Sequence, residues 1–261
     1  SGVPVMSREI INHPDFATTD TSSLLALSGG GAQVPPDLVL KIEEKITTAR
    51  PTTGYGMTET CGIITSLGGD FFVDRPSSAG PAMPNFAVKC VDDNGNEVPL
   101  GEPGELWVKG SSVIKGYINR PDATAQTTTD GWLHTGDVAR LDEDGFIYIV
   151  DRKKDLVIRG GENVSCTEVE ACVYRAPGVA ECCVFSVPDV RLGEEIAVAV
   201  VMKAGESLTA EALIAHCTDH MSKHKVPRYV RFFTDPLPRN ASGKFLRREL
   251  REQLAGELEG A

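Results

Sequence analysis

The stretch LLALSGGGA, residues 24–32, is an apolar run that ends in three glycines. This pattern is typical of a buried strand whose end approaches a ligand, because missing side chains leave the backbone accessible. A helix is predicted to follow, since Pro35 and Pro36 suit a helix start. Apolar residues then recur at helical spacing up to Arg50-Pro51, namely Leu38, Ile42, Ile46 and Ala49. A strand that leads into a helix predicts an α/β arrangement for this part of the chain.

The pattern changes twice farther along the chain. Residues 80–151 form short alternating runs with turn signals such as Asp93-Asn94-Gly95, which predicts a β-rich subdomain. After Asp151, helical and strand patterns alternate again and predict a small α+β domain. The expected helices span 167–176, a segment opening near 209, and 245–254, and the expected strands span 182–187, 196–202 and 229–233.

We therefore expect an α/β and α+β multidomain protein divided at 1–79, 80–151 and 152–261. The 261-residue chain opens with Ser1-Gly2-Val3-Pro4, directly in what reads as a domain interior, which predicts a fragment. The net charge of −11 argues against a nucleic-acid binder, which needs a basic surface.

The seven cysteines are never spaced as CxxC and are expected to be reduced, mostly buried residues of a cytoplasmic protein. No apolar run approaches the roughly 20 residues that span a bilayer.

Two common phosphate-binding glycine motifs, GxxxxGK[ST] and GxGxxG, are absent. Seven other segments are present in a fixed order. They are GGA (30–32), GYGMTET (54–60), GELWVKG (104–110), WLHTGD (132–137), DRKKD (151–155), GGEN (160–163) and NASGK (240–244). In sequence and in order they resemble the signatures of the adenylate-forming family of acyl-CoA synthetases, luciferases and peptide-synthetase adenylation domains. The resemblance covers the chain from about Leu24 to Leu254.

The resemblance implies a remnant of the large adenylate-forming domain with a β-rich subdomain, followed by a small, mobile C-terminal domain. It implies an enzyme that activates a carboxylic acid with ATP and passes the acyl group to coenzyme A. Bacterial ligases for fatty or aromatic acids are the most similar members.

The resemblance also implies which residues bind ATP or AMP. Gly30, Gly31 and Ala32 would lie against adenine, and Tyr55, beside Gly56, would stack on it. A buried strand end is the alternative explanation for the glycines.

Two further residues of the GYGMTET segment would contact the phosphates. Thr58 would hydrogen-bond phosphate oxygens and Glu59 would help to hold Mg²⁺, which prefers hard oxygen ligands. Helix N-terminal charge is the alternative for Glu59.

The ribose and phosphate contacts would come from the middle of the chain. Asp137 would accept hydrogen bonds from both ribose hydroxyls, since a carboxylate offers only acceptors. Ile149 and Arg152 would complete the nucleotide pocket. The alternatives are a turn aspartate and a surface arginine.

The last part of the chain would supply the hinge, the coenzyme A contact and the catalytic lysine. Lys154 lies at the family's hinge position, and Gly160-Gly161 would line a tunnel for the pantetheine arm of coenzyme A, unless they form a simple turn. Lys244 would sit between the incoming carboxylate and the α-phosphate and relieve their repulsion.

The resemblance also predicts what this sequence lacks. The Thr/Ser/Gly-rich loop that clasps the β- and γ-phosphates in the family should lie upstream of Ser28, so we expect the 261 residues alone not to catalyse adenylation. Two alternatives stay open for the whole enzyme: adenylation for another acceptor such as a carrier protein, and a non-catalytic module on the same scaffold.

Three histidines, His216, His220 and His224, recur four residues apart and could share one helix face. No HExxH motif accompanies them, which favours a solvated or half-buried face over a metal site.

Overall fold

The computed structural model describes residues 2–31, 34–240 and 243–259 and divides the chain into two compact units, Ser1–Ile149 and Val150–Ala261. Each unit has its own sheets and its own buried core, and the mixed sheets with packed helices confirm the predicted fold class. The strand β9 (Phe146–Arg152) runs across the boundary between the units. The predicted division at 79/80 and 151/152 stays a prediction.

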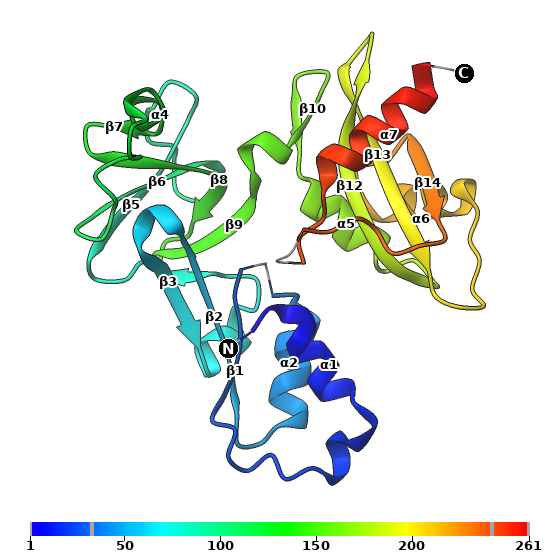
Figure 1. Cartoon of the computed structure of the whole chain (residues 1–261), viewed down its shortest axis with the longest axis horizontal. Helices are drawn as coiled ribbons and strands as arrows, with labels where there is room; N and C mark the ends of the chain where they lie inside the picture. Colours follow the sequence, from blue (N-terminus) through cyan, green and yellow to red (C-terminus); the bar gives the residue numbers. More distant parts are fainter. Residues whose placement is uncertain (1, 32–33, 241–242, 260–261) are drawn as a thin grey trace. The chain divides into compact units, whose positions relative to one another are not determined.

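The first part of unit 1 is a three-stranded sheet with helices packed on it (Figure 1). Strand β1 pairs with β2 in parallel, and β2 pairs with β3 in antiparallel fashion. The elements are α1 (Pro4–Asn12), η1 (Pro14–Thr18), β1 (Ala26–Gly29), α2 (Pro36–Lys45), β2 (Arg50–Met57), η2 (Thr58–Thr60), β3 (Gly62–Gly68) and α3 (Asp70–Asp74).

Helix α2 forms where the apolar spacing predicts it, but it ends at Lys45, earlier than predicted. Its buried face carries Leu38, Val39 and Ile42, each of which stabilises the fold by about 1.5–3 kcal/mol when fully buried. The backbone is extended at Ile46 because the chain must return to begin β2 beside β1. Ile46 remains buried outside the helix.

The second part of unit 1 is a six-stranded sheet in the order β4-β9-β8-β6-β5, with β7 paired to β8. Its pairs are antiparallel where their register is given, as expected of a β-rich subdomain. The remaining elements are β4 (Gly80–Pro81), β5 (Phe86–Val91), β6 (Gly104–Gly110), α4 (Pro121–Thr127), β7 (Thr128–Thr129) and β8 (Trp132–Leu141). The short helix α4, like α1, was not among the elements expected from the sequence.

Unit 2 is a five-stranded sheet between two layers of helices. Its elements are η3 (Lys153–Asp155), β10 (Val157–Arg159), β11 (Glu162–Val164), α5 (Cys166–Val173), β12 (Val179–Asp189), β13 (Gly193–Met202), α6 (Ala210–His220), η4 (Lys223–Lys225), β14 (Tyr229–Phe233) and α7 (Arg247–Glu259). All the predicted helices and strands of this region are present. The hairpin β10–β11 was not predicted.

Both faces of the β12–β13 pair are buried, which explains why these strands read as continuous apolar runs. Alternate residues such as Cys182 and Val184 pack with α5 and α6, and the intervening Cys183 and Phe185 pack with α7. In Figure 1, α7 lies across β12, in agreement with this division of the core.

Six of the seven cysteines are buried and all are free thiols, as predicted, while Cys61 is exposed. Within the described residues no helix combines the length and the apolar character that a membrane crossing requires.

Candidate functional site

Two of the predicted nucleotide-binding residues, Tyr55 on β2 and Asp137 on β8, meet in unit 1. The Tyr55 hydroxyl donates a hydrogen bond of 2.6 Å to Oδ2 of Asp137, although 82 positions separate them. Asp137 is only 8% exposed, so its carboxylate depends on such donors to offset the cost of burial. The structure therefore joins an aromatic ring and an acceptor-only side chain in one place.

Both residues lie at irregularities of their sheets. Along β8, His134 pairs with Trp107 and Val138 with Glu105, so three residues of β8 stand opposite Leu106 alone. Side-chain bonds hold this bulge, because the Thr135 hydroxyl donates to the Leu106 carbonyl at 2.7 Å and accepts from the Asp137 amide at 3.1 Å. The pairing of β2 with β3 also shifts directly after Tyr55. Bulges of this kind re-aim side chains beside active sites.

Glu59 lies in η2, a single 3-10 turn, immediately after β2. The Tyr117 hydroxyl donates to Glu59 Oε1 at 2.8 Å, and the Ile114 amide donates to the Glu59 carbonyl at 2.8 Å. The hydrogen bond to Glu59 raises the pKa of the Tyr117 phenol. The second carboxylate oxygen of Glu59 accepts no hydrogen bond from the described residues, and the exposed hydroxyl of Thr58 likewise makes none with them.

This oxygen and the Thr58 hydroxyl are hard donors, and their chemistry fits Mg²⁺. Among the described residues no cluster of three or more His, Cys, Asp or Glu side chains exists, so most ligands of such an ion would have to be water or substrate oxygens.

The glycines predicted to approach adenine differ in what surrounds them. A side chain at Gly30 would meet no atom within 4 Å, and Gly31 has φ +74°, which a residue with a side chain rarely adopts. Ala32 lies outside the described residues. Packing already requires a glycine at position 56, because a Cβ there would collide with the Gly62 carbonyl, and its place beside adenine stays a prediction.

Ile149 is the last residue of unit 1 and packs at the edge of the core formed by Ile64, Leu106 and Ile147. Its side chain is partly buried, and its role toward a nucleotide stays a prediction.

Arg152 and Lys154 belong to unit 2 and have exposed side chains. The segment that carries them is held at both ends by buried or half-buried carboxylates. Asp151 accepts from the Ser165 hydroxyl at 2.9 Å and from the Thr167 amide at 3.0 Å, and Asp155 pairs with Arg247 at 3.3 Å. Between these two anchors the chain forms the 3-10 turn η3, and the Leu156 amide donates to the Arg152 carbonyl at 3.1 Å. The hinge role of Lys154 stays a prediction.

Gly160 and Gly161 form the two-residue turn of the β10–β11 hairpin, with Arg159 and Glu162 as the closing pair. Both have positive φ, +61° and +91°, as the tight turns of two-residue hairpins require. Turn geometry therefore suffices to explain both glycines, and their role toward coenzyme A stays a prediction.

Lys244 lies in unit 2 between β14 and α7. Its backbone carbonyl accepts from the Asn240 amide at 2.9 Å, and its amide donates to Asn240 Oδ1 at 2.9 Å. The ammonium is exposed and has no hydrogen-bond or ion-pair partner among the described residues. A cation held in this way is available to an anionic substrate.

The three histidines do not share one helix face, so that interpretation of their spacing is wrong. Helix α6 ends at His220, and His224 lies in η4, where its Nε2 is 3.2 Å from the Glu162 carboxylate. Stacked rings of His216 and His220, 4.4 Å apart, remain on the helix.

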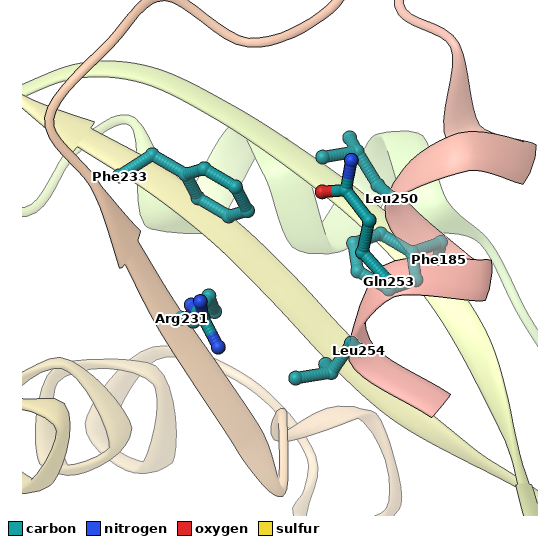
Figure 2. Close-up of a pocket in the computed structure, with 6 residues that line it drawn as sticks. All are labelled: Phe185, Arg231, Phe233, Leu250, Gln253 and Leu254. Atoms are coloured by element: carbon teal, nitrogen blue, oxygen red, sulfur yellow. The ribbon is translucent and has the colours of Figure 1, made fainter. Parts of the chain in front are cut away.

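Two cavities in the described part of the chain contain none of the predicted site residues. One cavity, of about 10 Å³, lies in unit 2 and is no larger than one water. Figure 2 shows the side chains from β12, β14 and α7 that line it. Its lining is Phe185, Arg231, Phe233, Leu250, Gln253 and Leu254. A hollow of about 530 Å³ in unit 1 lies between α1, η1 and the segment at Leu24.

The sequence analysis did not single out Tyr117 and Thr135, which bond the predicted site residues Glu59 and Asp137. It also did not single out Arg239, which donates to the carbonyl of Gly243, the residue before Lys244. Each lies within a few residues of a recognised segment or in it. Their partners, however, are distant in sequence or are bonded through the backbone, and the spacing of residues in a motif does not indicate such contacts.

Comparison with known proteins agrees with the motifs. The family model described as AMP-binding enzyme matches residues 1–118, and the model described as AMP-binding enzyme C-terminal domain matches residues 168–244. The long-chain-fatty-acid–CoA ligase of Escherichia coli O6:H1 is 42% identical over 99% of this chain. A feruloyl-CoA synthase of an Amycolatopsis species is 42% identical over 97% of it. The chain spans 46% and 51% of these two relatives, about half of their length.

Solved structures give the same result. The o-succinylbenzoate CoA synthetase of Bacillus subtilis, in complex with its acyl-adenylate intermediate, superposes with a TM-score of 0.86 at 34% identity, over 96% of this chain and 50% of that one. ATP-bound MatB of Rhodopseudomonas palustris gives 0.88 at 33% identity, over 97% and 50%. An amide bond synthetase of Marinactinospora thermotolerans gives 0.87 at 32% identity, over 97% and 51%.

Proposed function

The chain belongs to the family of AMP-binding, adenylate-forming enzymes, and on that premise we propose that the whole enzyme is an AMP-forming acyl-CoA synthetase. The observation that carries the proposal is the hydrogen bond between Tyr55 and Asp137. It joins, across 82 positions, the residues that would stack on adenine and bind ribose.

The first half-reaction is adenylation. A carboxylate oxygen attacks the α-phosphorus of ATP, a new P–O bond forms, and the bond to the β-phosphate breaks, so that pyrophosphate leaves. Two anions approach each other in this step, and Lys244, with no partner among the described residues, would attract both.

The triphosphate contacts would come from unit 1. Thr58 would donate to a phosphate oxygen, and Glu59 would help to hold Mg²⁺ with the carboxylate oxygen that the described residues leave without a donor. A bound Mg²⁺ supplies charge neutralisation on the phosphates. Tyr117 fixes the orientation of the Glu59 carboxylate.

The nucleoside contacts would come from β1, β2, β8 and β9. Asp137 would accept from the ribose hydroxyls, Tyr55 and Gly56 would flank adenine with Gly30, Gly31 and Ala32, and Ile149 and Arg152 would complete the pocket. Support for this arrangement is the open space at Gly30 and the burial of Asp137.

The second half-reaction transfers the acyl group. The coenzyme A sulfur attacks the acyl carbon, a C–S bond forms, the C–O bond to AMP breaks, and the thiol proton is released. Torsion change at Lys154 would move the small domain between the two half-reactions, and Gly160-Gly161 would lie along the pantetheine arm. Val150, the first residue of the second compact unit, lies four positions before Lys154, which supports a hinge in this part of the chain.

Fatty or aromatic monocarboxylates are the proposed substrate class, since relatives at 42% identity carry the names long-chain-fatty-acid–CoA ligase and feruloyl-CoA synthase.

The test is release of AMP and pyrophosphate by the full-length enzyme with Mg-ATP and short, medium, long and aromatic acids, each with and without coenzyme A. Acid-dependent AMP release that consumes coenzyme A is expected. In the same enzyme, Lys244→Ala should cripple adenylation and largely spare thioester formation from supplied acyl-AMP. Equal loss in both steps would contradict the role of Lys244.

A second candidate is adenylation for a different acceptor. The likeness to a structure named as an amide bond synthetase favours keeping this candidate, since that name implies an acceptor other than coenzyme A. Acid-dependent pyrophosphate release without consumption of coenzyme A would support it.

A further inference from the structure

We propose that Arg239, clamped by Glu181, is a positioning residue that holds Lys244 in place for adenylation. This inference rests on the proposed function of Lys244 and assigns to the same reaction two residues that lie outside the recognised motifs. Neither touches the substrate in this proposal.

The guanidinium of Arg239 has three separate partners. Its Nη2 donates to Glu181 Oε1 at 3.0 Å, its Nη1 donates to the Gly243 carbonyl at 2.8 Å, and its Cζ lies 3.8 Å from the centre of the Phe245 ring. Gly243 and Phe245 are the two neighbours of Lys244 in the chain. Arg239 therefore contacts the backbone of the residue before Lys244 and the side chain of the residue after it.

Glu181 connects this grip to the rigid sheet. Its other oxygen, Oε2, accepts from the Leu237 amide at 3.0 Å, so that one carboxylate binds both Leu237 and Arg239. Leu237 is 2% exposed and packs in the core between β12 and α7. The clamp thus ties the backbone beside Lys244 to a buried core of unit 2.

Strand alternation explains why Glu181 is available. Glu181 pairs with Val201 in the same register that holds from Cys182 to Asp189, and the shift in β12 lies before it. It therefore lies on the same face of the sheet as Cys183 and Phe185, which pack with α7. This face is the one that Leu237 also packs against.

The backbone beside the lysine is held locally. Arg239 and Phe245 form an isolated antiparallel bridge, and Asn240 and Lys244 are joined by two hydrogen bonds. Phe245 also packs against the core beside α7. The guanidinium of Arg239 adds a charged link from this segment to β12 through Glu181.

Arginine suits this role and lysine does not. A planar fork can donate in two directions while its face stacks on an aromatic ring, whereas an ammonium is a single point of charge. Arg239→Lys keeps the charge and removes the geometry. A displacement of about 1 Å at a catalytic group can cost on the order of 100-fold in rate.

The experiment uses the full-length enzyme with the variants Arg239→Lys, Lys244→Ala and the double variant. Arg248→Lys is the matched control, because Arg248 is an exposed α7 arginine paired with Glu252 one turn later. Two steps are measured separately: acid-dependent formation of pyrophosphate, and formation of thioester from supplied acyl-AMP and coenzyme A.

We expect Arg239→Lys to lower the rate of adenylation about 10- to 100-fold, to leave thioester formation within about 2-fold, and to have no further effect once Lys244 is absent. Glu181→Gln should act in the same direction and more weakly. Arg248→Lys should leave both steps unchanged. Retained thioester formation shows that the variant is folded.

The proposal is overturned if Arg239→Lys adenylates normally while Lys244→Ala does not, or if the losses multiply in the double variant. Parallel loss of both half-reactions in Arg239→Lys would also overturn it, because a general structural defect acts on both. If Lys244→Ala itself adenylates normally, the proposed role of Lys244 fails and the positioning role fails with it.

Discussion

The Tyr55 hydroxyl donates to the Asp137 carboxylate over 2.6 Å, and both residues stand at breaks in the regular pairing of their strands. The bond fixes the direction in which the second oxygen of a nearly buried carboxylate can accept. An acceptor oriented in this way is suited to a pair of neighbouring hydroxyls on one sugar.

Tyr55→Phe in the full-length enzyme should therefore raise the KM for ATP roughly 10-fold, with a smaller effect on kcat. A hydrogen bond to a charged group contributes about 1.5–3 kcal/mol, and 1.4 kcal/mol corresponds to tenfold. Steady-state adenylation with varied ATP is the measurement. Tyr148→Phe is the control, because the Tyr148 hydroxyl donates to Asp142 at 3.1 Å in the same unit. A similar rise in both variants would show that the effect is not specific to Asp137.

Tyr117→Phe should raise the Mg²⁺ concentration needed for half-maximal adenylation severalfold. Without the 2.8 Å bond, the Glu59 carboxylate loses its fixed orientation but keeps its charge. The measurement is a titration with MgCl₂ at saturating ATP, compared with Glu59→Gln, which should have the larger effect. An unchanged Mg²⁺ dependence in Tyr117→Phe, with a shifted one in Glu59→Gln, would remove Tyr117 from the site.

Gly160→Asn separates the turn explanation from the coenzyme A explanation of the Gly160-Gly161 pair. Asn-Gly is a favoured sequence for a two-residue hairpin turn with positive φ, so the β10–β11 hairpin should form, with a small shift of the Leu192 side chain, whose Cδ2 lies 3.2 Å from the added Cβ. If the pantetheine arm passes this turn, the added side chain should raise the KM for coenzyme A at least severalfold and spare adenylation. Normal kinetics in both half-reactions would leave the glycines with a turn role alone.

Arg247→Met should destabilise unit 2 by about 3 kcal/mol, at the lower end of the range for a broken buried ion pair because Arg247 is 27% exposed. Arg247 donates to Glu170 at 2.9 Å and to the Val184 carbonyl at 3.1 Å. Burial already raises the pKa of Glu170, and loss of Arg247 removes the main charge that opposes this shift.

Hydrogen exchange of the β12 amides in the full-length enzyme measures that loss locally. Arg248→Met, the exposed neighbour on α7, should change protection by less than about 1 kcal/mol, as surface pairs do. Equal effects of the two substitutions would contradict the assignment of Arg247 as the buried anchor of α7.

The sequence by itself determined the classes of element and the residue types available for chemistry. Periodicity located α2, α5, α6 and β14, because burial of one face imposes a repeat that the chain displays locally. Periodicity also predicted that α2 continues beyond Lys45, because Ile46 and Ala49 are buried although they are not helical. It also missed the β10–β11 hairpin, whose strands are only three residues long.

Only the tertiary structure decided how those residues are held. The bond from Tyr55 to Asp137 spans 82 positions, Tyr117 reaches Glu59 across 58, and Glu181 reaches Arg239 across 58. Each contact depends on where strands shift register or where a loop folds back. Register shifts and loop paths are set by the competition between packing of residues distant in sequence and regular backbone pairing. The local spacing of residues does not reveal the outcome of that competition. The residue types that carry the chemistry could therefore be predicted from the sequence, but their arrangement in space could not.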